Sequence, residues 1–392
     1  MEQKEAKALF AERQQMMDNV YAHKHNKRVM LGSNSYTWAI IDKGYKLNDA
    51  LYDPKKLEEV TRYHQEQYGF DMHTDVQNRN CMRVTALLGG GRSRIDDEKN
   101  SLYVLDASYM EGDEYQEYAE NPSEFLFKKV FRRYAKPELT MAELKVAIRE
   151  WDLFTEGNTY RNEMLVKEYG CLLYFRTFPD APLESLFGRY RGIKGLSVDL
   201  RKHKKELKEY CERHFQEYAL PTLKTAIEGG RGYAANLSSD WTGYVAPINL
   251  SFLAYSVLNP KQFAEFYWPY NKYVIDECAK SGMRIYAHAE GTCLRFADFY
   301  DDIPKGMMMF HLEQDDPFEF RKRLPHIAIA GGMPCNLLGG ASKEECVDYA
   351  KKLIDGLGDG FVLDQDKMMS YATDCKGENL KAVNDFARNY QY

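Results

Sequence analysis

The sequence lacks the features that mark membrane, secreted and nucleic-acid-binding proteins. No run of apolar residues approaches the ~18 that a membrane-spanning helix needs, and the stretch MEQKEAKALFAERQQ is charged and helical in pattern, unlike a cleavable leader. The eight cysteines contain no CxxC pair and no regular framework spacing, so we expect reduced thiols in a cytoplasmic protein. A formal net charge of −6 argues against a basic face for nucleic acid.

The chain is rich in apolar and aromatic residues. Hydrophobic residues make up 44% and charged residues 29% of the 392 positions, which is enough apolar surface for a large core. Aromatic residues make up 14%, with 29 tyrosines, and such flat amphipathic rings suit pockets and interfaces. We therefore expect a folded protein that binds neither nucleic acid nor membranes. A homodimer is an open alternative to a monomer.

Alternating apolar residues predict short buried strands with helical patterns between them. Parallel-type strands are expected near about residues 30, 72, 174, 234, 286, 309, 329 and 362. Eight strands with intervening helices are typical of a (β/α)8 TIM barrel, here one domain over residues 1–392. We also expect an N-terminal helix over residues 1–27 and an inserted antiparallel hairpin region over residues 81–110. A doubly wound open sheet is the alternative, but no GxGxxG follows the first strand.

Polar side chains follow the predicted strands where each strand ends. The stretch MRIYAHAEGTC begins as a strand and ends in His288 and Glu290, and later strands end near His311, Cys335 and Asp366. The carboxyl ends of barrel strands converge on one mouth, where barrel enzymes carry their chemistry. Histidines, thiolates and carboxylates are the donors of an open zinc site that activates a substrate atom. The candidate zinc ligands are His288, Glu290, Cys335 and Cys375.

Each candidate also has a structural interpretation. His288 is compatible with a hydrogen-bonded histidine of the core, and the acidic run after His311 with a solvated loop. Cys335 and Cys375 are compatible with small apolar groups that pack in the interior. The aromatic residues of the loop after the first strand are compatible with plain surface positions, although a barrel mouth is where such rings would line a ligand pocket.

Three stretches of the chain resemble the uroporphyrinogen decarboxylase superfamily. They are LNPKQFAEFYWPYNKYVIDECAKSGMRIYAHAEGTC, IAIAGGMPCNLLGGASKEECVDYAKKLID and GFVLDQDKMMSYATDCKGENLKAVNDFAR. Together they cover the C-terminal part of the chain, and a weaker likeness runs through RQQMMDNVYAHKHNKRVML, YGFD and YMEGDEYQEYAENPSEF. The resemblance implies a (β/α)8 barrel, which agrees with the strand pattern.

The superfamily holds cofactor-free decarboxylases and zinc-dependent methyltransferases that exchange methyl groups with a corrinoid. The first loop here, SNSYTWAI, is neutral and aromatic, which does not suit a polycarboxylate porphyrin. The branch that methylates coenzyme M carries His-x-Cys where this chain has His288-Ala289-Glu290. The segment MEGDEYQEYAENP resembles instead the methyltransferases of anaerobic O-demethylase systems. That likeness implies a zinc site that pairs an acidic ligand, Glu290 or a carboxylate after His311, with Cys335 and Cys375.

These features predict methyl transfer from a small aromatic methyl donor, an aryl methyl ether, to the Co(I) corrinoid of a partner protein. The chain has no corrinoid-binding Asp-x-His-x-x-Gly segment, so cobalamin would come on that separate corrinoid protein. Zinc, or an acid held protonated by burial, would stabilise the departing phenolate. The candidate catalytic residues are Glu290, Asp366 and His311, and the candidate residues around the donor ring are Tyr36, Trp38 and Trp241.

Two alternatives stay open at the level of sequence. The first is transfer in the reverse direction, from a methylcorrinoid to a thiol. The absence of His-x-Cys counts against it, because thiol activation favours a thiolate-rich zinc site. The second is a non-catalytic barrel that binds a corrinoid protein or an aromatic ligand, which would fit the loss of the usual ligand pattern.

Overall fold

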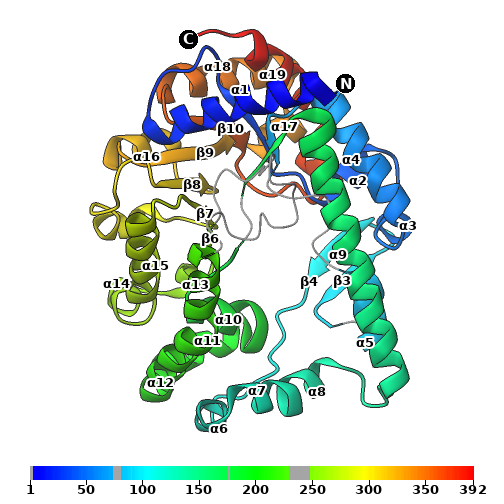
Figure 1. Cartoon of the computed structure of the whole chain (residues 1–392), viewed down its shortest axis with the longest axis vertical. Helices are drawn as coiled ribbons and strands as arrows, with labels where there is room; N and C mark the ends of the chain where they lie inside the picture. Colours follow the sequence, from blue (N-terminus) through cyan, green and yellow to red (C-terminus); the bar gives the residue numbers. More distant parts are fainter. Residues whose placement is uncertain (1–2, 74–80, 90, 175–176, 229–247) are drawn as a thin grey trace.

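The fold is built on eight parallel strands, each followed by helices (Figure 1). The computed structural model describes residues 3–73, 81–89, 91–174, 177–228 and 248–392. Within the sheet the strands lie in the order β5-β2-β1-β10-β9-β8-β7-β6. The strands are β1 (Met30–Ser33), β2 (Met72–His73), β5 (Leu172–Leu173), β6 (Ile248–Phe252), β7 (Ile285–Ala289), β8 (Met308–Leu312), β9 (Ala328–Met333) and β10 (Phe361–Gln365).

The two edges of this sheet meet and close a barrel. Beyond β5, Thr177 forms a parallel bridge with Ile248 at the start of β6. The backbone N–H of Asn249 donates to the Thr177 carbonyl at 2.8 Å. Closure leaves side chains of alternate residues pointing into the barrel and brings the carboxyl ends of the strands to one mouth. The predicted (β/α)8 architecture is therefore confirmed.

Helices cover the outside of the barrel and form an arm between β2 and β5. The arm carries the hairpin of β3 (Ser93–Asp96) and β4 (Ser101–Val104), and its short helices lie far from α1 (Figure 1). The helices are α1 (Gln3–Ala22), α2 (Thr37–Asp42), α3 (Leu47–Ala50), α4 (Pro54–Tyr68), α5 (Met82–Leu88), α6 (Tyr115–Glu120), α7 (Pro122–Phe125), α8 (Phe131–Tyr134), α9 (Met141–Tyr169), α10 (Pro182–Ser185), α11 (Gly192–Lys202), α12 (Lys204–His214), α13 (Leu220–Glu228), α14 (Pro260–Gln262), α15 (Trp268–Ser281), α16 (Pro317–Arg323), α17 (Cys335–Gly340), α18 (Lys343–Leu357) and α19 (Gly377–Asn389).

The longest helix, α9, shows how local sequence sets the element boundaries. Thr140 and Glu143 form a capping box at its start, which satisfies backbone N–H groups that the first turn leaves without partners. Gly170 ends the helix in the left-handed conformation with φ of 62°. A Cβ at Gly170 would lie 2.5 Å from the Ala6 carbonyl oxygen, so glycine also permits the close approach of α1.

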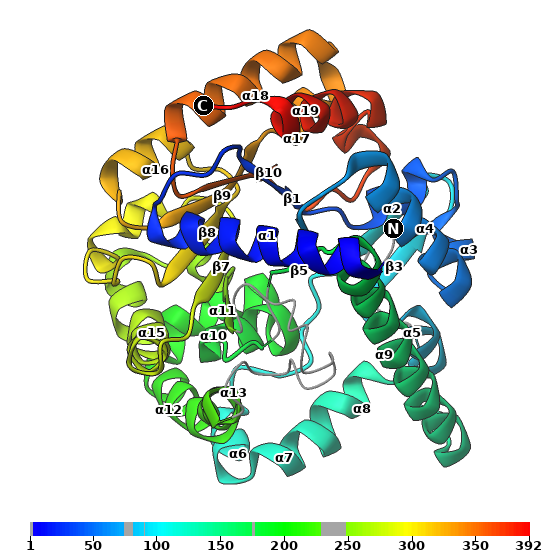
Figure 2. The ribbon, with the colours of Figure 1, turned by 45° about the horizontal axis from the view of Figure 1, so that its top comes forward.

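Helix α1 lies across the amino-terminal end of the barrel (Figure 2). Its apolar side chains, including Met17 and Tyr21, pack in one cluster with inward residues of the strands such as Met30 and Met309. The Tyr21 hydroxyl donates to the Ile285 carbonyl at 3.2 Å. The helix therefore closes the end of the barrel opposite the mouth.

Period-two alternation divides the strand residues between two cores. Inward residues such as Tyr286 and Val362 join the cluster inside the barrel, whereas their neighbours Ile285 and Phe361 pack against the outer helices. The same alternation continues to the carboxyl ends of the strands. There it turns polar side chains toward the interior.

Several predicted elements differ from those observed. The strand expected near residue 234 lies outside the described residues, and the fourth barrel strand is β6, which the sequence reading missed. Residues 81–110 hold the expected hairpin, but Met82–Leu88 is a helix where short strands were predicted. Its residues are followed by Gly89 with φ of 105°, a helix C-cap. None of the helices in the described ranges is both long enough and apolar enough to span a bilayer.

Candidate active site at the barrel mouth

The mouth of the barrel contains a layer of polar side chains from several strands. His288, His311 and Asp364 occupy the same inward phase near the ends of β7, β8 and β10, and His288 is aligned with His311 in the strand register. Tyr174 follows β5 and Asn34 follows β1, so both enter the same layer. We call these five residues the polar layer. All of its members except His288 are fully buried or nearly so.

Asp364 is the centre of hydrogen bonding in the polar layer. Its Oδ2 accepts from the Tyr174 hydroxyl at 2.8 Å, and its Oδ1 accepts from the Gln365 backbone N–H at 2.7 Å. Asn34 Nδ2 donates to His311 Nε2 at 3.2 Å, and His311 Nε2 lies 4.0 Å from Asp364 Oδ2. These contacts connect three strands through one carboxyl group and fix the position of the His311 ring.

Burial changes the acid strength of Asp364. Desolvation raises its pKa to about 7, against hydrogen bonds from Tyr174 and backbone N–H groups that lower it. The site is packed tightly enough that a Cβ at Gly32 would lie 2.5 Å from both Asp364 Oδ2 and the Tyr174 hydroxyl. Glycine on β1 therefore leaves the space that this carboxyl group occupies.

The outer end of the polar layer reaches solvent through His288 and Glu290. The two rings of His288 and His311 stack with centroids 5.3 Å apart and an interplanar angle of 29°. His288 Nε2 lies 3.7 Å from Glu290 Oε1, and the Glu290 side chain is 48% exposed. The backbone of Glu290 is held in place, because its carbonyl accepts from the Tyr255 hydroxyl at 2.6 Å. The pair can meet a ligand at the mouth.

The acidic run after β8 fixes the neighbouring loop. Glu313 Oε2 accepts from the Gly291 backbone N–H at 2.5 Å, and Asp315 Oδ2 accepts from the backbone N–H groups of Cys293 and Leu294. Asp316 caps the start of α16. Glu313 and Asp315 therefore position the turn that follows Glu290.

A second buried carboxyl group supports the β6 side of the mouth. Glu184 on α10 accepts from the backbone N–H groups of Leu253 and Ala254 and from the Tyr267 hydroxyl at 2.6 Å. Burial, and then the nearby Asp180 carboxyl, raise the pKa of Glu184 to about 8. Glu184 thereby holds the chain where it leaves β6.

The predicted cysteine ligands lie in two other places. Cys335 Sγ lies 3.6 Å from the Lys367 carbonyl oxygen, and the Cys335 backbone N–H donates to Asp366 Oδ1 at 3.0 Å. Cys375 packs beside Trp38, whose indole N–H donates to the Cys375 carbonyl at 2.9 Å. Burial raises the pKa of both thiols and of Asp366.

The zinc prediction does not fit this donor arrangement. Among the residues that the structure describes, no three His, Cys, Asp or Glu side chains are grouped to hold one metal ion. His288 and Glu290 lie together at the mouth, Cys335 lies with Asp366, and Cys375 lies with Trp38. Zinc binding stays a prediction, and we assign it no step.

The predicted ring-binding residues occupy different environments. Tyr36 is buried at the start of α2, and its backbone N–H donates to the Met369 carbonyl at 2.9 Å. Trp38 is buried in α2, with its ring 5.8 Å from the ring of Tyr68 on α4. Trp241 lies outside the described residues. The Trp38 ring therefore belongs to the packing between helices, and Tyr36 lies in the short connection between β1 and α2.

The comparisons place these observations among known proteins. Residues 253–390 match the family model for uroporphyrinogen decarboxylase. The resemblance to that family is confirmed over this stretch. The uroporphyrinogen-decarboxylase-like stretch holds His288, Glu290, His311 and Asp364, whereas Asn34 and Tyr174 precede it. No curated protein matches the sequence.

A solved structure extends the likeness to the whole chain. A methyltransferase from Methanosarcina mazei superposes with a TM-score of 0.56 over 96% of this chain and 98% of that one, at 13% identity. At this identity the likeness shows a shared fold. The uroporphyrinogen-decarboxylase-like stretch thus forms one part of a barrel to which the preceding residues also contribute strands.

Sequence reasoning found the outer part of the site and missed its centre. His288, Glu290 and His311 were singled out by their places at strand ends. At the end of the eighth strand Asp364 and Asp366 were both considered and Asp366 was chosen, although alternation along Phe361–Gln365 turns Asp364 to the same side as Val362. Tyr174 was not singled out. Tyr174 follows β5 and Asp364 lies on β10, with β2 and β1 between them in the sheet, so the two side chains meet across the barrel interior, which the spacing alone does not reveal.

Proposed function

We propose that this chain is a methyltransferase that moves a methyl group from a small aryl methyl ether to the Co(I) corrinoid of a separate protein. The uroporphyrinogen-decarboxylase-like stretch and the fold shared with a methyltransferase support this reaction class. The observation that carries the proposal is the polar layer, which ends at the partly exposed pair of His288 and Glu290. It offers protons at the point where a donor would enter the barrel.

The chemical problem in this reaction is the leaving group. The bond between the methyl carbon and the ether oxygen breaks, and the oxygen keeps the bonding electrons. The Co(I) centre supplies the electron pair that forms the new bond to carbon. A phenolate leaves poorly unless its charge is neutralised, so a proton delivered to the oxygen lowers the barrier. The products are a phenol and the methylated corrinoid.

We assign this proton to the pair of His288 and Glu290. Glu290 Oε1 faces His288 Nε2, so the carboxylate orients the imidazole and balances its charge when it is protonated. The stacked ring of His311, held by Asn34, backs His288 from the interior. His311 and Asp364 are positioning residues in this scheme, because both are fully buried.

The remaining roles follow from position. Tyr36, which lies between β1 and α2, would orient a donor ring in this scheme. The corrinoid arrives on its own protein, which would dock over the mouth. Zinc is left out of the scheme because the described donors do not form a site.

The test is a set of variants in a single-turnover assay with methoxyarenes and a Co(I) corrinoid protein. Glu290→Gln keeps the size of the side chain and removes its charge, so transfer should slow by roughly 10²–10⁴-fold, the range for lost acid–base catalysis. Glu319→Gln, on the exposed face of α16, is the matched control and should transfer at the wild-type rate. Wild-type transfer by Glu290→Gln would remove the pair from the scheme.

A further inference from the structure

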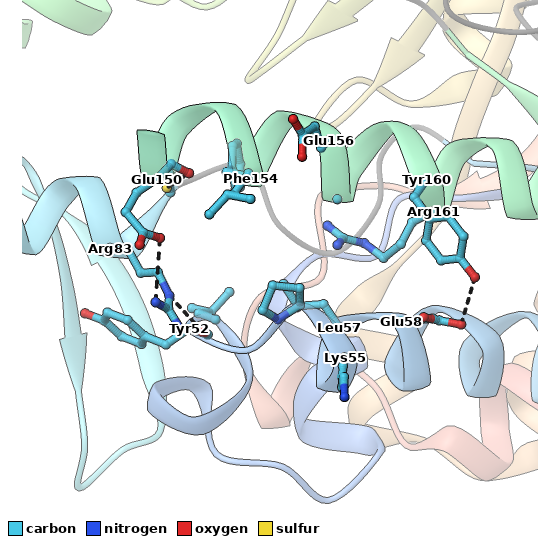
Figure 3. A pocket seen from close by; sticks show the side chains of 15 residues that line it. Tyr52, Lys55, Leu57, Glu58, Arg83, Glu150, Phe154, Glu156, Tyr160 and Arg161 are labelled. Carbon is cyan, nitrogen blue, oxygen red and sulfur yellow. Dashed lines mark hydrogen bonds and ion pairs between the residues drawn. The ribbon is translucent and has the colours of Figure 1, made fainter. Parts of the chain in front are cut away.

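The cavities outside the polar layer differ in the charges of their walls. A cavity of about 460 Å³ between α4 and α9 has equal numbers of cations and carboxylates in its wall, so its charges favour neither sign of ligand (Figure 3). These residues are Lys55, Arg83, Arg161, Glu58, Glu150 and Glu156. A second cavity, of about 420 Å³, is lined by Arg201 and Arg295, and no Asp or Glu is among the described residues of its wall. We call it the arginine cavity.

The arginine cavity lies beside the barrel mouth. Its wall is formed by α11, which carries Ser197 and Arg201, and by the segments that follow β6 and β7. Segments that follow barrel strands lie at the mouth end. Tyr255 connects the cavity to the mouth, because its carbonyl accepts from Arg295 Nη2 at 2.7 Å and its hydroxyl donates to the Glu290 carbonyl at 2.6 Å. A ligand in this cavity would therefore lie next to the mouth, outside the polar layer.

Arg295 is held in place although its side chain is exposed. Its Nη2 donates to the carbonyls of Tyr255 at 2.7 Å and Ser256 at 3.1 Å, and its guanidinium carbon lies 4.5 Å from the centroid of the Phe296 ring. In the described part of the chain, its Nε and Nη1 have no hydrogen-bond partner and its charge has no ion pair. A guanidinium that is fixed in advance loses little rotamer freedom when an anion binds.

Arg201 brings a second guanidinium from another element. Its side chain is exposed on α11 and forms neither an ion pair nor a hydrogen bond with the residues that the structure describes. It also begins a basic run, Arg-Lys-His-Lys-Lys over residues 201–205, in a chain whose formal net charge is −6. Such a run makes the local potential positive and attracts anions. The cavity therefore offers two arginines whose charges the protein itself does not neutralise.

Asn259 adds a neutral donor to the same wall. Its side-chain oxygen accepts from the Gln262 backbone N–H at 3.0 Å in a capping box, which fixes the orientation of the amide. The Asn259 Nδ2 group has no hydrogen-bond partner among the described residues. The wall thus combines two cations with a neutral N–H donor.

We propose that the arginine cavity binds a phosphate group. Phosphate carries up to two charges and exposes oxygens on several sides, so it can pair with two guanidinium groups, whereas one guanidinium fork is enough for a carboxylate. Asn259 would donate to a remaining oxygen. The group can come from free phosphate or from a small organic phosphate, and a cavity of about 420 Å³ has room for the organic part.

The test is calorimetric titration of the whole chain with phenyl phosphate, inorganic phosphate and benzoate, in a buffer free of phosphate and sulfate. Phenyl phosphate should bind. Benzoate has the same ring and a single charge, and it should bind at least about tenfold more weakly. Tighter binding of phenyl phosphate than of inorganic phosphate would assign the cavity to an organic phosphate, and equal or weaker binding would assign it to free phosphate.

Arg201→Gln and Arg295→Gln should each weaken phosphate binding at least about tenfold, as expected for a lost hydrogen bond to a charged group. Arg201→Gln should fold like the wild type, because the Arg201 side chain contacts no described partner, and circular dichroism checks both variants. Arg149→Gln is the matched control. Arg149 is exposed on α9 and lies outside the cavity wall, so its replacement should leave binding unchanged.

Three results would overturn the proposal. The first is binding of phenyl phosphate that is undiminished in both arginine variants, which would place the anion elsewhere. The second is binding of benzoate as tight as that of phenyl phosphate. The third is the absence of binding of either phosphate compound to the wild type at roughly millimolar concentration. None of them bears on methyl transfer at the mouth.

Discussion

Replacing Asp364 by asparagine tests whether the carboxyl group in the polar layer is neutral in the folded protein. Burial raises its pKa from 3.8 to about 7. In the unfolded chain the carboxyl group releases its proton near its ordinary pKa. Between these two values the folded state holds a proton that the unfolded state has lost, so rising pH destabilises the fold. Asparagine resembles the neutral acid in shape and does not titrate.

The size of the effect follows from the shift. Three pKa units at about 1.4 kcal/mol each correspond to roughly 4 kcal/mol between the acid and alkaline limits. About 3 kcal/mol of this falls between about pH 5 and pH 8, because part of the loss precedes pH 5. Glu184, with a pKa of about 8, titrates in both proteins and cancels in the comparison.

The assay is urea unfolding of the wild type and Asp364→Asn at several pH values across that interval. The free energy of unfolding of the wild type should fall relative to that of the variant as the pH rises, by about 3 kcal/mol over the interval. Parallel curves for the two proteins would show that Asp364 is ionised throughout and would refute the reasoning. A constant difference in the free energy of unfolding between the two proteins does not affect the test, because only the change of that difference with pH is compared.

Three further substitutions test the packing around the site. Gly32→Ala places a Cβ 2.5 Å from Asp364 Oδ2 and should lower the free energy of unfolding by roughly 1–3 kcal/mol or more. Arg13→Met removes a partner 2.8 Å from buried Asp71 and should cost about 3 kcal/mol at neutral pH. Burial alone would raise the pKa of Asp71, but Arg13 and Arg28 hold it at about 2. The loss of stability caused by Arg13→Met should therefore shrink as the pH falls toward that value. Trp38→Phe should cost about 1–3 kcal/mol through a lost hydrogen bond and lost packing.

Urea unfolding checks all three substitutions, and the glycine and arginine variants each have a control of the same chemistry. Gly340→Ala has nothing within 4 Å of the added carbon and should be nearly neutral. Lys322→Met, at an exposed pair with Glu319, should change stability by less than about 1 kcal/mol. Equal losses in a test variant and its control would contradict the structural explanation.

The fold was predictable because its signal repeats. The apolar segments around Met309, Ile329 and Val362 are strands that are buried on both faces. Each of these strands follows a helical stretch, so the same pattern repeats along the chain. The helix Met82–Leu88 was missed because short glycine-flanked segments carry too few residues to distinguish the two periods. The strand Ile248–Phe252 was missed because the stretch near residue 234 precedes it with an equally strong apolar pattern.

The site was predictable only where sequence neighbours act together. His288 lies on β7 and Glu290 directly follows the strand, so the two side chains are close in sequence and meet at 3.7 Å. Asp364 and Tyr174 meet at 2.8 Å from strands that are 190 residues apart in sequence. Cys335 and Cys375 follow successive strands, but Cys335 Sγ lies beside the Lys367 carbonyl whereas Cys375 Sγ lies beside the Lys376 carbonyl, which spacing cannot show.

The most direct test of the central claim is a product balance for the wild-type chain. A methoxyarene and a Co(I) corrinoid protein are mixed with it, and the phenol and the methylated corrinoid are both quantified. The proposed reaction predicts equal amounts of the two products, formed only when the chain is present. Absence of both products with a range of methoxyarenes, while the chain remains folded by circular dichroism, would contradict methyl transfer from aryl ethers.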